Sequence, residues 1–262
     1  MEPRLRVAES RLIATTLKKS LSVFMRRFGY RIQRFRPQPP FGIDPFRDMR
    51  KLLPVDRSPI IFDVGANVGQ TIENFRRSFG QPTIHSFEPS SDAFVELQNT
   101  AGLLPGVVLN NFALGARSGE AQLFESAAGT PINSLLEPGP EGYGEGKVKG
   151  TVPVHVSTVD QYCRDRGIER IDILKTDAQG YDFEVIKGAT EMIAARAVHL
   201  IYMEIIFSDW YRGQPRMDEV YGFIADHGFV LVTFYPFYYW DNKASWTEAL
   251  FRHPEYRFKV DA

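Results

Sequence analysis

Alternation of short apolar runs with helix-like stretches constrains the fold of this 262-residue chain more than any other feature. Apolar runs that predict strands occupy residues 60–64, 83–89, 107–114, 171–177, 198–206, 229–235 and 248–254, and helical periodicity falls at 70–79, 91–100, 182–190 and 217–228. Strands that alternate with helices are typical of a doubly wound α/β sheet in which most strands are parallel. Two further apolar runs, 119–126 and 152–160, predict a β-hairpin insertion around a mobile loop, rich in Gly and Pro, at 129–150.

The N-terminal segment differs from the rest of the chain in charge. Residues 1–36 contain ten Arg or Lys and two acidic residues, a local net charge of +8, so the remainder carries −9 of the total of −1. Leucines and phenylalanines at helical spacing predict an amphipathic helix over 7–28. Four prolines between residues 36 and 46 predict an extended linker. We therefore expect a basic helix and linker at 1–57 and one domain at 58–262.

Two interpretations of the basic helix stay open. Its basic side chains can meet anionic headgroups while Leu and Phe enter the acyl boundary, which would place the protein peripherally at the inner face of a membrane. The same apolar stripe can instead pack against the domain or against a twin subunit in a homodimer. A basic amphipathic N-terminus also resembles an organelle transit peptide, but no clear cleavage signal follows it.

Composition excludes several classes of protein. Cys163 is the sole cysteine, so an intramolecular disulfide cannot form and a reducing, cytoplasmic location is expected. No apolar run approaches 18 residues, and we expect no transmembrane helix. The net charge of −1 gives no general case for nucleic-acid binding. The five histidines lack the spacing of a zinc site, so we expect no metal.

The segment 60–71, IIFDVGANVGQT, predicts a ligand-binding turn between a buried strand and a helix. Its two glycines let the backbone turn sharply, and Glu88 ends the next strand, where a carboxylate can accept hydrogen bonds from both hydroxyls of a ribose. A dinucleotide site would need a second glycine where Asn67 stands, and Asp63 would repel a pyrophosphate. S-adenosylmethionine carries a ribose, an amine and a sulfonium cation but no phosphate, so the turn favours it over NAD.

Six motifs give the chain a family resemblance over residues 59–254: FDVGANVGQ, FEP, NFALG, STVDQYC, ILKTDAQGYDFEVIKGA and ALFRHP. With these motifs the sequence resembles the class I S-adenosylmethionine-dependent methyltransferases, and more narrowly the FkbM family. The resemblance implies a seven-stranded sheet with an antiparallel last strand. It also implies methyl transfer to oxygen, often on sugar hydroxyls of polyketides, glycolipids or surface polysaccharides.

The most specific motif, residues 173–189, departs from the usual family pattern. The four varying positions hold Thr176, Ala178, Gln179 and Asp182. Gln179 stands where many members carry a carboxylate. The sequence therefore gives no support to a mechanism that needs an acid at residue 179.

The resemblance also implies which residues hold the cofactor. The turn after the first strand would line its methionine and ribose end with Asp63, Gly65, Ala66, Asn67, Gly69 and Gln70. Glu88 would hold the ribose diol, and Pro89 would shape the turn under the adenine. Asn111 and Ala113 would lie beside the adenine, although plain packing at a strand end explains them equally well.

Asp177 is the strongest catalytic candidate, because it ends a buried strand at the carboxyl edge of the sheet, where ligands bind in open α/β folds. It would orient or deprotonate an acceptor hydroxyl, or order the cofactor amine; the alternative role is a helix N-cap. Glu204 ends the next strand at the same edge, and His155, near the insertion, is a further candidate. Lys175 is expected to be a structural salt-bridge partner.

Two other functions stay open beside an O-methyltransferase that acts on a small-molecule or glycan acceptor. A nicotinamide-dependent oxidoreductase shares the strand, turn and helix layout, although the missing glycine argues against it. A non-catalytic binding protein on a methyltransferase scaffold is kept open by Gln179.

Overall fold

The computed structural model describes residues 24–25, 41–54, 58–126, 132–142 and 148–257. Contacts within the chain divide it into two units, residues 1–40 and residues 41–262. In the first unit Phe24 and Met25 are helical. The rest of the amphipathic helix predicted at 7–28 lies outside the described residues, so its membrane and subunit interpretations stay predictions.

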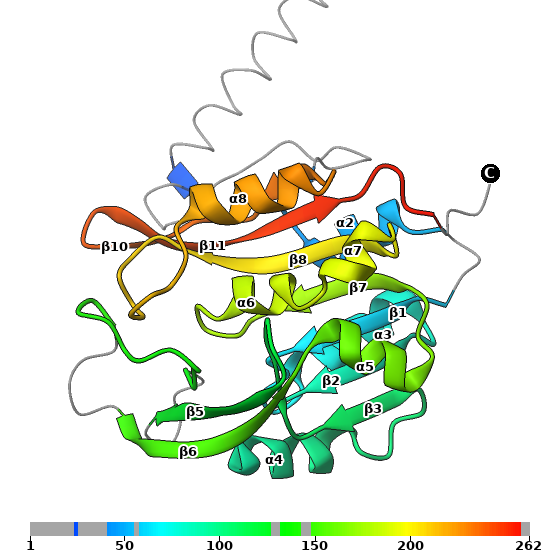
Figure 1. The fold of residues 1–262 in the computed structure, drawn as a ribbon. Helices are drawn as coiled ribbons and strands as arrows, with labels where there is room; N and C mark the ends of the chain where they lie inside the picture. The colour runs from blue at the N-terminus through cyan, green and yellow to red at the C-terminus, as the bar shows by residue number, and fades with distance from the viewer. Residues whose placement is uncertain (1–23, 26–40, 55–57, 127–131, 143–147, 258–262) are drawn as a thin grey trace, which may run out of the picture. The chain divides into compact units, whose positions relative to one another are not determined.

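In the described part of the second unit, eight strands form one sheet in the order β10-β11-β8-β7-β1-β2-β3, with β9 paired to β11 (Figure 1). The strands are β1 (Ile60–Val64), β2 (Thr83–Phe87), β3 (Val107–Asn110), β7 (Ile171–Thr176), β8 (Val198–Ile206), β9 (Val230–Phe234), β10 (Tyr238–Trp240) and β11 (Lys243–Arg252). Every pairing from β3 to β8 is parallel, whereas β11 runs antiparallel to β8, β9 and β10. The predicted doubly wound, mostly parallel, seven-stranded sheet is confirmed, and the short strand β10 extends its edge.

Helices cover both faces of this sheet. One face carries α5 (Val159–Arg166), α6 (Asp182–Lys187), α7 (Thr190–Ala194) and α8 (Met217–Asp226), and the other carries α2 (Pro45–Leu52), α3 (Gln70–Phe79) and α4 (Ser91–Ala101). Adjacent strand residues divide between the two apolar cores: Leu174 faces the first set of helices and Ile173 the second. None of the helices in the described ranges combines the length and apolar character that a bilayer crossing needs.

The predicted β-hairpin insertion forms a small sheet of its own. It consists of β4 (Ala113–Leu114), β5 (Gly119–Ser126) and β6 (Val148–Ser157), with β5 antiparallel and β4 parallel to β6. The single strand expected over 107–114 is therefore two strands. The chain leaves the main sheet where the side-chain amides of Asn110 and Asn111 donate to the carbonyl oxygens of Ser86 and Glu88 (3.0 and 2.9 Å).

Residues 132–142, part of the predicted mobile loop, are held in place by backbone hydrogen bonds. Ser134 exchanges two of them with Phe124 of β5 (2.8 and 3.2 Å), and the N–H of Gly139 donates to the carbonyl of Trp210, in the loop after β8 (2.6 Å). This segment therefore forms a fixed wall between the insertion and the main sheet. Residues 127–131 and 143–147 of the predicted loop lie outside the described residues.

Helix α2 differs from the prediction, which placed residues 45–52 before the start of the domain. Asp44 caps the helix, because its side chain accepts from the N–H of Arg47 (3.1 Å), and Pro45 occupies the first turn, where its missing N–H costs no hydrogen bond. Met49 of this helix is fully buried in the core that contains α3. The compact unit accordingly begins at Phe41 rather than at residue 58.

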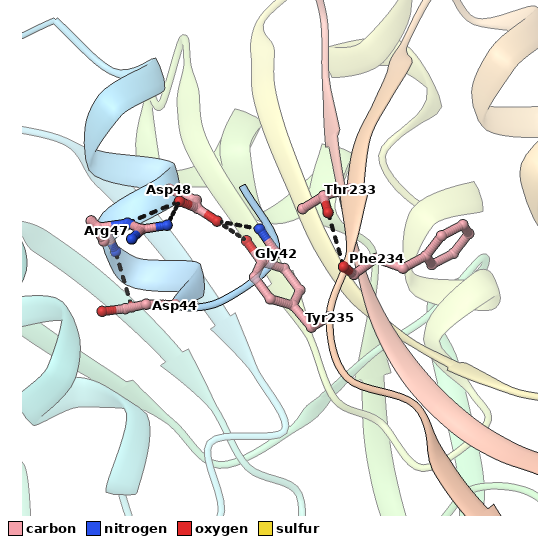
Figure 2. Close-up of polar contacts among 7 residues, drawn as sticks. All are labelled: Gly42, Asp44, Arg47, Asp48, Thr233, Phe234 and Tyr235. Carbon is pink, nitrogen blue, oxygen red and sulfur yellow. Dashed lines mark hydrogen bonds and ion pairs between the residues drawn. The ribbon is translucent and has the colours of Figure 1, made fainter. Parts of the chain in front are cut away.

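Asp48 fastens α2 to the far edge of the sheet (Figure 2). Its carboxylate is fully buried and accepts hydrogen bonds from the N–H of Gly42 (2.7 Å) and from the side chain of Arg47 (2.7 Å). The hydroxyl of Tyr235, directly after β9, lies 3.5 Å from the same carboxylate. Burial and the neighbouring Asp48 carboxylate both raise the pKa of Tyr235, so its hydroxyl stays a donor.

Candidate active site

The turn after β1 is held against the ends of two neighbouring strands. The N–H groups of Gly65 and Ala66 donate to the carbonyl oxygen of Phe87, at the end of β2 (3.0 and 3.1 Å). Gly65 has a φ of +72°, and a Cβ at this position would lie 1.9 Å from the carbonyl oxygen of Asp177. Only a residue without a side chain fits there, so glycine sets the distance between the turn and the end of β7.

Asn67 and Glu88 join the same turn to β2. Asn67 has a φ of +48°, a left-handed conformation that Asn adopts more readily than most residues, and its N–H donates to Oε2 of Glu88 (2.9 Å). Oε1 of Glu88 accepts from the N–H of Ser90 (2.8 Å). Burial raises the pKa of Glu88, and the two N–H groups oppose that shift. Each carboxylate oxygen keeps a lone pair, so Glu88 can still accept bonds from two hydroxyls.

A cavity of about 510 Å³ lies at the carboxyl ends of the parallel strands. The sequence-predicted residues that line it are Gly65, Asn67, Gln70, Glu88, Pro89, Ala113, Asp177 and Glu204. The predicted residues outside its lining are Asp63, Ala66, Gly69, Asn111 and His155. The cofactor turn and the two predicted catalytic acids therefore share one cavity.

His155 does not line the cavity, and its side chain packs within the insertion instead. It lies on β6, and its ring packs edge-on against Phe112 with the ring centroids 5.8 Å apart. Asn111 likewise supports the wall from behind, because its amide holds the carbonyl of Glu88. We therefore drop His155 from the catalytic candidates.

Asp63 is fully buried behind the turn and acts through Lys175. The Nζ of Lys175 lies 2.9 Å from Oδ1 of Asp63 and donates to the carbonyl oxygens of Val64 and Gly65 (3.3 and 3.1 Å). Burial lowers the pKa of Lys175, but the carboxylates of Asp63 and Asp177 outweigh it and raise that pKa above its ordinary value. The ammonium group thus stays charged and fixes the backbone of the cofactor turn.

Asp177 follows β7, with half of its side chain exposed to the cavity mouth. Its Oδ1 accepts from Nε2 of Gln179 (3.0 Å), and its Oδ2 lies 3.9 Å from Nζ of Lys175. The helix-cap alternative is contradicted: α6 begins at Asp182, and it is Asp182 whose carboxylate accepts from the N–H of Ala178 (3.1 Å). Asp177 is therefore free of a capping role.

Glu204 and Glu248 face each other across β8 and β11, and both line the cavity. Burial raises the pKa of Glu204 well above its usual range, and the nearby acids Asp177 and Asp182 raise it further. Oε2 of Glu204 accepts no hydrogen bond from the described residues. Burial also raises the pKa of Glu248, while a hydrogen bond from the Tyr202 hydroxyl lowers it.

Sequence reasoning missed Glu248 and two tryptophans of the cavity wall, Trp210 and Trp246. Trp246, on β11, joins the cavity wall to β10, because its ring stacks on that of Tyr238 with the ring centroids 3.9 Å apart. The signal in the sequence was a glutamate at the start of the predicted strand 248–254, directly before the apolar residues 249–251. Burying a carboxylate costs free energy unless it is paired or hydrogen-bonded.

The lining is poor in positive charge. Among the described residues of the cavity wall, Lys175 is the sole cation, and Asp63 already neutralises it. Within residues 41–54, 58–126, 132–142 and 148–257, no group of three His, Cys, Asp or Glu side chains is placed to hold a metal ion.

Similarity to known proteins covers most of this domain. Residues 63–231 match the family described as Methyltransferase FkbM domain. The 2-O-methyltransferase NoeI of Sinorhizobium fredii is 26% identical over 169 residues, which cover 60% of this chain and 67% of the relative. The methyltransferase sdnD of Sordaria araneosa is 29% identical over 51% of this chain and 61% of its own length. The hexuronic acid methyltransferase AglP of Haloferax volcanii is 24% identical over 57% of each chain.

The residues of the cavity suit the cofactor that such a match implies. Glu88 offers free lone pairs to a diol, the turn presents backbone close to the cavity, and the wall has no spare cation for a pyrophosphate in its described part. The matched segment spans more than half of the chain and contains the turn, Glu88, Asp177 and Glu204. The chain therefore belongs to the FkbM family of methyltransferases, and its cofactor is S-adenosylmethionine.

Proposed function

We propose that the protein methylates a hydroxyl group of a sugar, glycolipid, polysaccharide or polyketide-type acceptor. The observation that carries the proposal is one cavity that brings two sets of groups together. Glu88 and the Gly65 turn would form its cofactor end, and Asp177, Glu204 and Glu248 would form its acceptor end. The family match argues against a nicotinamide-dependent oxidoreductase, and the name of one relative, a 2-O-methyltransferase, supports a hydroxyl acceptor.

At the cofactor end, Glu88 would accept the two ribose hydroxyls, and Pro89 and Ala113 would flank the adenine. The backbone at Gly65 and Asn67, held by Lys175 and Glu88, would contact the methionine part. When bound, S-adenosylmethionine supplies a methyl group already activated by the sulfonium charge. The protein therefore has to orient the acceptor and accept its proton, because alignment contributes much of the rate of such a transfer.

At the acceptor end, Asp177 would take the proton that the hydroxyl loses as its oxygen is methylated. Asp177 is half exposed, so the proton can pass on to water. Burial raises the pKa of Glu204 well above its usual range, so Glu204 would offer a hydrogen-bond donor to another group of the acceptor rather than take this proton. The two acids would thus bind different groups of one acceptor.

The charge of the cavity wall limits further the class of acceptor that we propose. Three acids line this end of the cavity, and its one described cation is paired with Asp63. An acidic acceptor would be desolvated without a counterion, which is costly. We therefore include in the proposal that the acceptor is uncharged around the methylated hydroxyl.

The first test is cofactor binding, followed by methyl transfer. Thermal shift and calorimetry should show binding of S-adenosylhomocysteine and none of NADH. Tritiated S-adenosylmethionine should then label neutral methyl glycosides or a glycolipid extract of the source cells, and label the corresponding uronates at least tenfold more slowly. Binding of NADH alone, or faster labelling of uronates, would refute the respective part of the proposal.

The basic segment adds a proposal on location. We propose that residues 7–28 bind anionic membranes, where each basic side chain near the surface contributes about 1 kcal/mol. Full-length protein should float with anionic vesicles and be released by salt, whereas a chain that starts at Pro37 should not float. If neither floats, and the shortened chain is less stable to heat, the helix belongs to the fold or to a subunit contact.

A further inference from the structure

Gln179 lies between Asp177 and the buried side chain of Tyr211. Its Nε2 donates to Oδ1 of Asp177 (3.0 Å), and its Oε1 accepts from the hydroxyl of Tyr211 (2.8 Å). Tyr211 is buried, whereas the side chain of Asp177 is 48% exposed. The amide of Gln179 therefore connects a fixed hydroxyl to a carboxylate that is otherwise able to turn.

The chemistry of the three groups fixes the orientation of this amide. An ionised carboxylate only accepts hydrogen bonds, so the NH₂ end of the amide must face Asp177 and its oxygen must face Tyr211. A glutamate at residue 179, the acid of the usual family pattern, could still accept from Tyr211 but could not donate to Asp177. It would also add a second negative charge beside Asp177. The departure from the family pattern thus supplies a donor that the usual residue lacks.

Two segments of the cavity wall hold Gln179 in place. The buried hydroxyl of Ser134 donates to the carbonyl oxygen of Gln179 (2.7 Å). Tyr211 forms a β-bridge with Pro138, and its ring packs on the backbone of Gly180, where a Cβ would lie 2.8 Å from the ring. Gln179 itself has a φ of +53°. Neither the backbone nor the amide can rotate without breaking these bonds.

We propose that Gln179 is a positioning residue, which ties one oxygen of Asp177 so that the other faces the acceptor hydroxyl. This role rests on the proposed methyl transfer, in which Asp177 accepts the proton. The nearest other partner of the carboxylate is Lys175, at 3.9 Å from Oδ2. Without Gln179, Asp177 would sample several side-chain rotamers, and fewer encounters with the acceptor would be productive.

The test is Gln179→Glu, which keeps the size of the side chain and the bond from Tyr211 but removes the donor. A matched control is Gln161→Glu on α5. Gln161 also donates through Nε2 to a carboxylate, that of Asp165 (2.7 Å), and its oxygen also accepts, from Arg164 (3.0 Å). Kinetics with tritiated S-adenosylmethionine, neutral methyl hexosides and deoxyhexosides, and a glycolipid extract of the source cells give kcat and KM. Calorimetry with S-adenosylhomocysteine and thermal unfolding give the structural readouts.

Gln179→Glu should lower kcat at least tenfold, while KM, the affinity for S-adenosylhomocysteine and Tm stay near wild type. Gln161→Glu should match wild type throughout, and Tyr211→Phe should lower kcat by a smaller factor. If Gln179→Glu does not fold, Gln179→Asn, which tolerates the positive φ and is too short to reach Asp177, provides the same comparison. A kcat within twofold of wild type, or a loss of kcat matched by losses of affinity and Tm, would overturn the positioning role. Wild-type protein that binds S-adenosylhomocysteine but labels none of the probes would overturn the proposed function itself.

Discussion

Replacing Gly65 by alanine should disrupt the joint between the cofactor turn and β7. An ideal Cβ on Gly65 would lie 1.9 Å from the carbonyl oxygen of Asp177 and 2.8 Å from its carbonyl carbon. Both atoms belong to the backbone, so no side-chain rotation relieves the overlap. The turn also cannot move away freely, because its N–H groups are bound to Phe87 and its carbonyl to Lys175.

The loss of folding free energy in Gly65→Ala has two parts. A residue with a side chain in the left-handed region costs roughly 1–2 kcal/mol relative to its favoured conformation. Overpacking a tight contact costs typically about 1–3 kcal/mol more, because neighbouring backbone must shift. The free energy of unfolding should therefore fall by about 2–5 kcal/mol for Gly65→Ala.

Gly167→Ala separates the two parts. Gly167, after α5, has a φ of +63°, and a Cβ there would meet no atom within 4 Å. It should lose only the conformational cost, about 1–2 kcal/mol, in urea unfolding. In calorimetry it should bind S-adenosylhomocysteine like wild type, whereas Gly65→Ala should bind at least tenfold more weakly because Gly65 lines the cavity. Equal losses of stability in the two variants, with unchanged affinity for Gly65→Ala, would refute the close-approach argument.

Four further outcomes are expected. Glu88→Ala should weaken S-adenosylhomocysteine binding at least tenfold in calorimetry, because charge-assisted bonds to a diol contribute about 1.5–3 kcal/mol; unchanged affinity would refute the ribose assignment. Asp177→Asn, which caps no helix, should unfold within about 0.5 kcal/mol of wild type yet lose about 100-fold or more in turnover; full activity would exclude a proton-accepting role. Asp48→Ala should lower the free energy of unfolding by about 1–3 kcal/mol, since it removes the buried acceptor of the Gly42 N–H and of the partly buried Arg47 side chain; a neutral effect would show that α2 is not part of the cooperative unit. Burial and the neighbouring Asp177 raise the pKa of Asp182 from its ordinary value of 3.8 to about 6, so the folded state holds that proton more tightly than the unfolded state. This contribution to stability is fully present below the ordinary pKa and is lost as pH rises through the raised one. Stability of Asp182→Asn measured against pH should lack this fall, and parallel curves for variant and wild type would contradict the assignment.

Local signals were sufficient for the elements that build the cofactor end. Helix α3 and strands β1, β5 and β8 have the predicted bounds, and in the first three a Gly or Pro marks the boundary: Gly69 and Gly80 flank α3, Pro59 and Gly65 flank β1, and Gly119 begins β5. Helix α2 was missed because the prolines at residues 37–45 were interpreted as a linker, although proline marks element boundaries elsewhere in the chain. Asp44 followed by Pro45 was the available signal, an N-cap residue before a proline at the first helical position.

The residues at the proposed acceptor end come together through the order of the strands in the sheet, which a local sequence pattern does not predict. Glu248 and Trp246 reach the cavity because β11 inserts antiparallel between β8 and β9, although it lies near the end of the chain. The register that sets Glu248 opposite Glu204 follows from that insertion. His155, on the insertion strand β6, lies outside the cavity lining, and its side chain packs on Phe112.

Asp177 and Glu204 differ in burial, whereas the sequence analysis could compare them only by their positions at strand ends. Asp177 and Glu204 both stand at the carboxyl edge of adjacent parallel strands, yet Asp177 lies on the turn beyond β7 and Glu204 lies within β8. Asp177 is half exposed and accepts a hydrogen bond from the Gln179 amide, whereas burial raises the pKa of Glu204 well above its usual range. In the proposed reaction, one strand end would therefore supply an acceptor for the proton of the hydroxyl, and the next would supply a donor for a second group. A neutral polyol ring would offer both groups at once, which supports the proposed sugar hydroxyl over an isolated acid or amine.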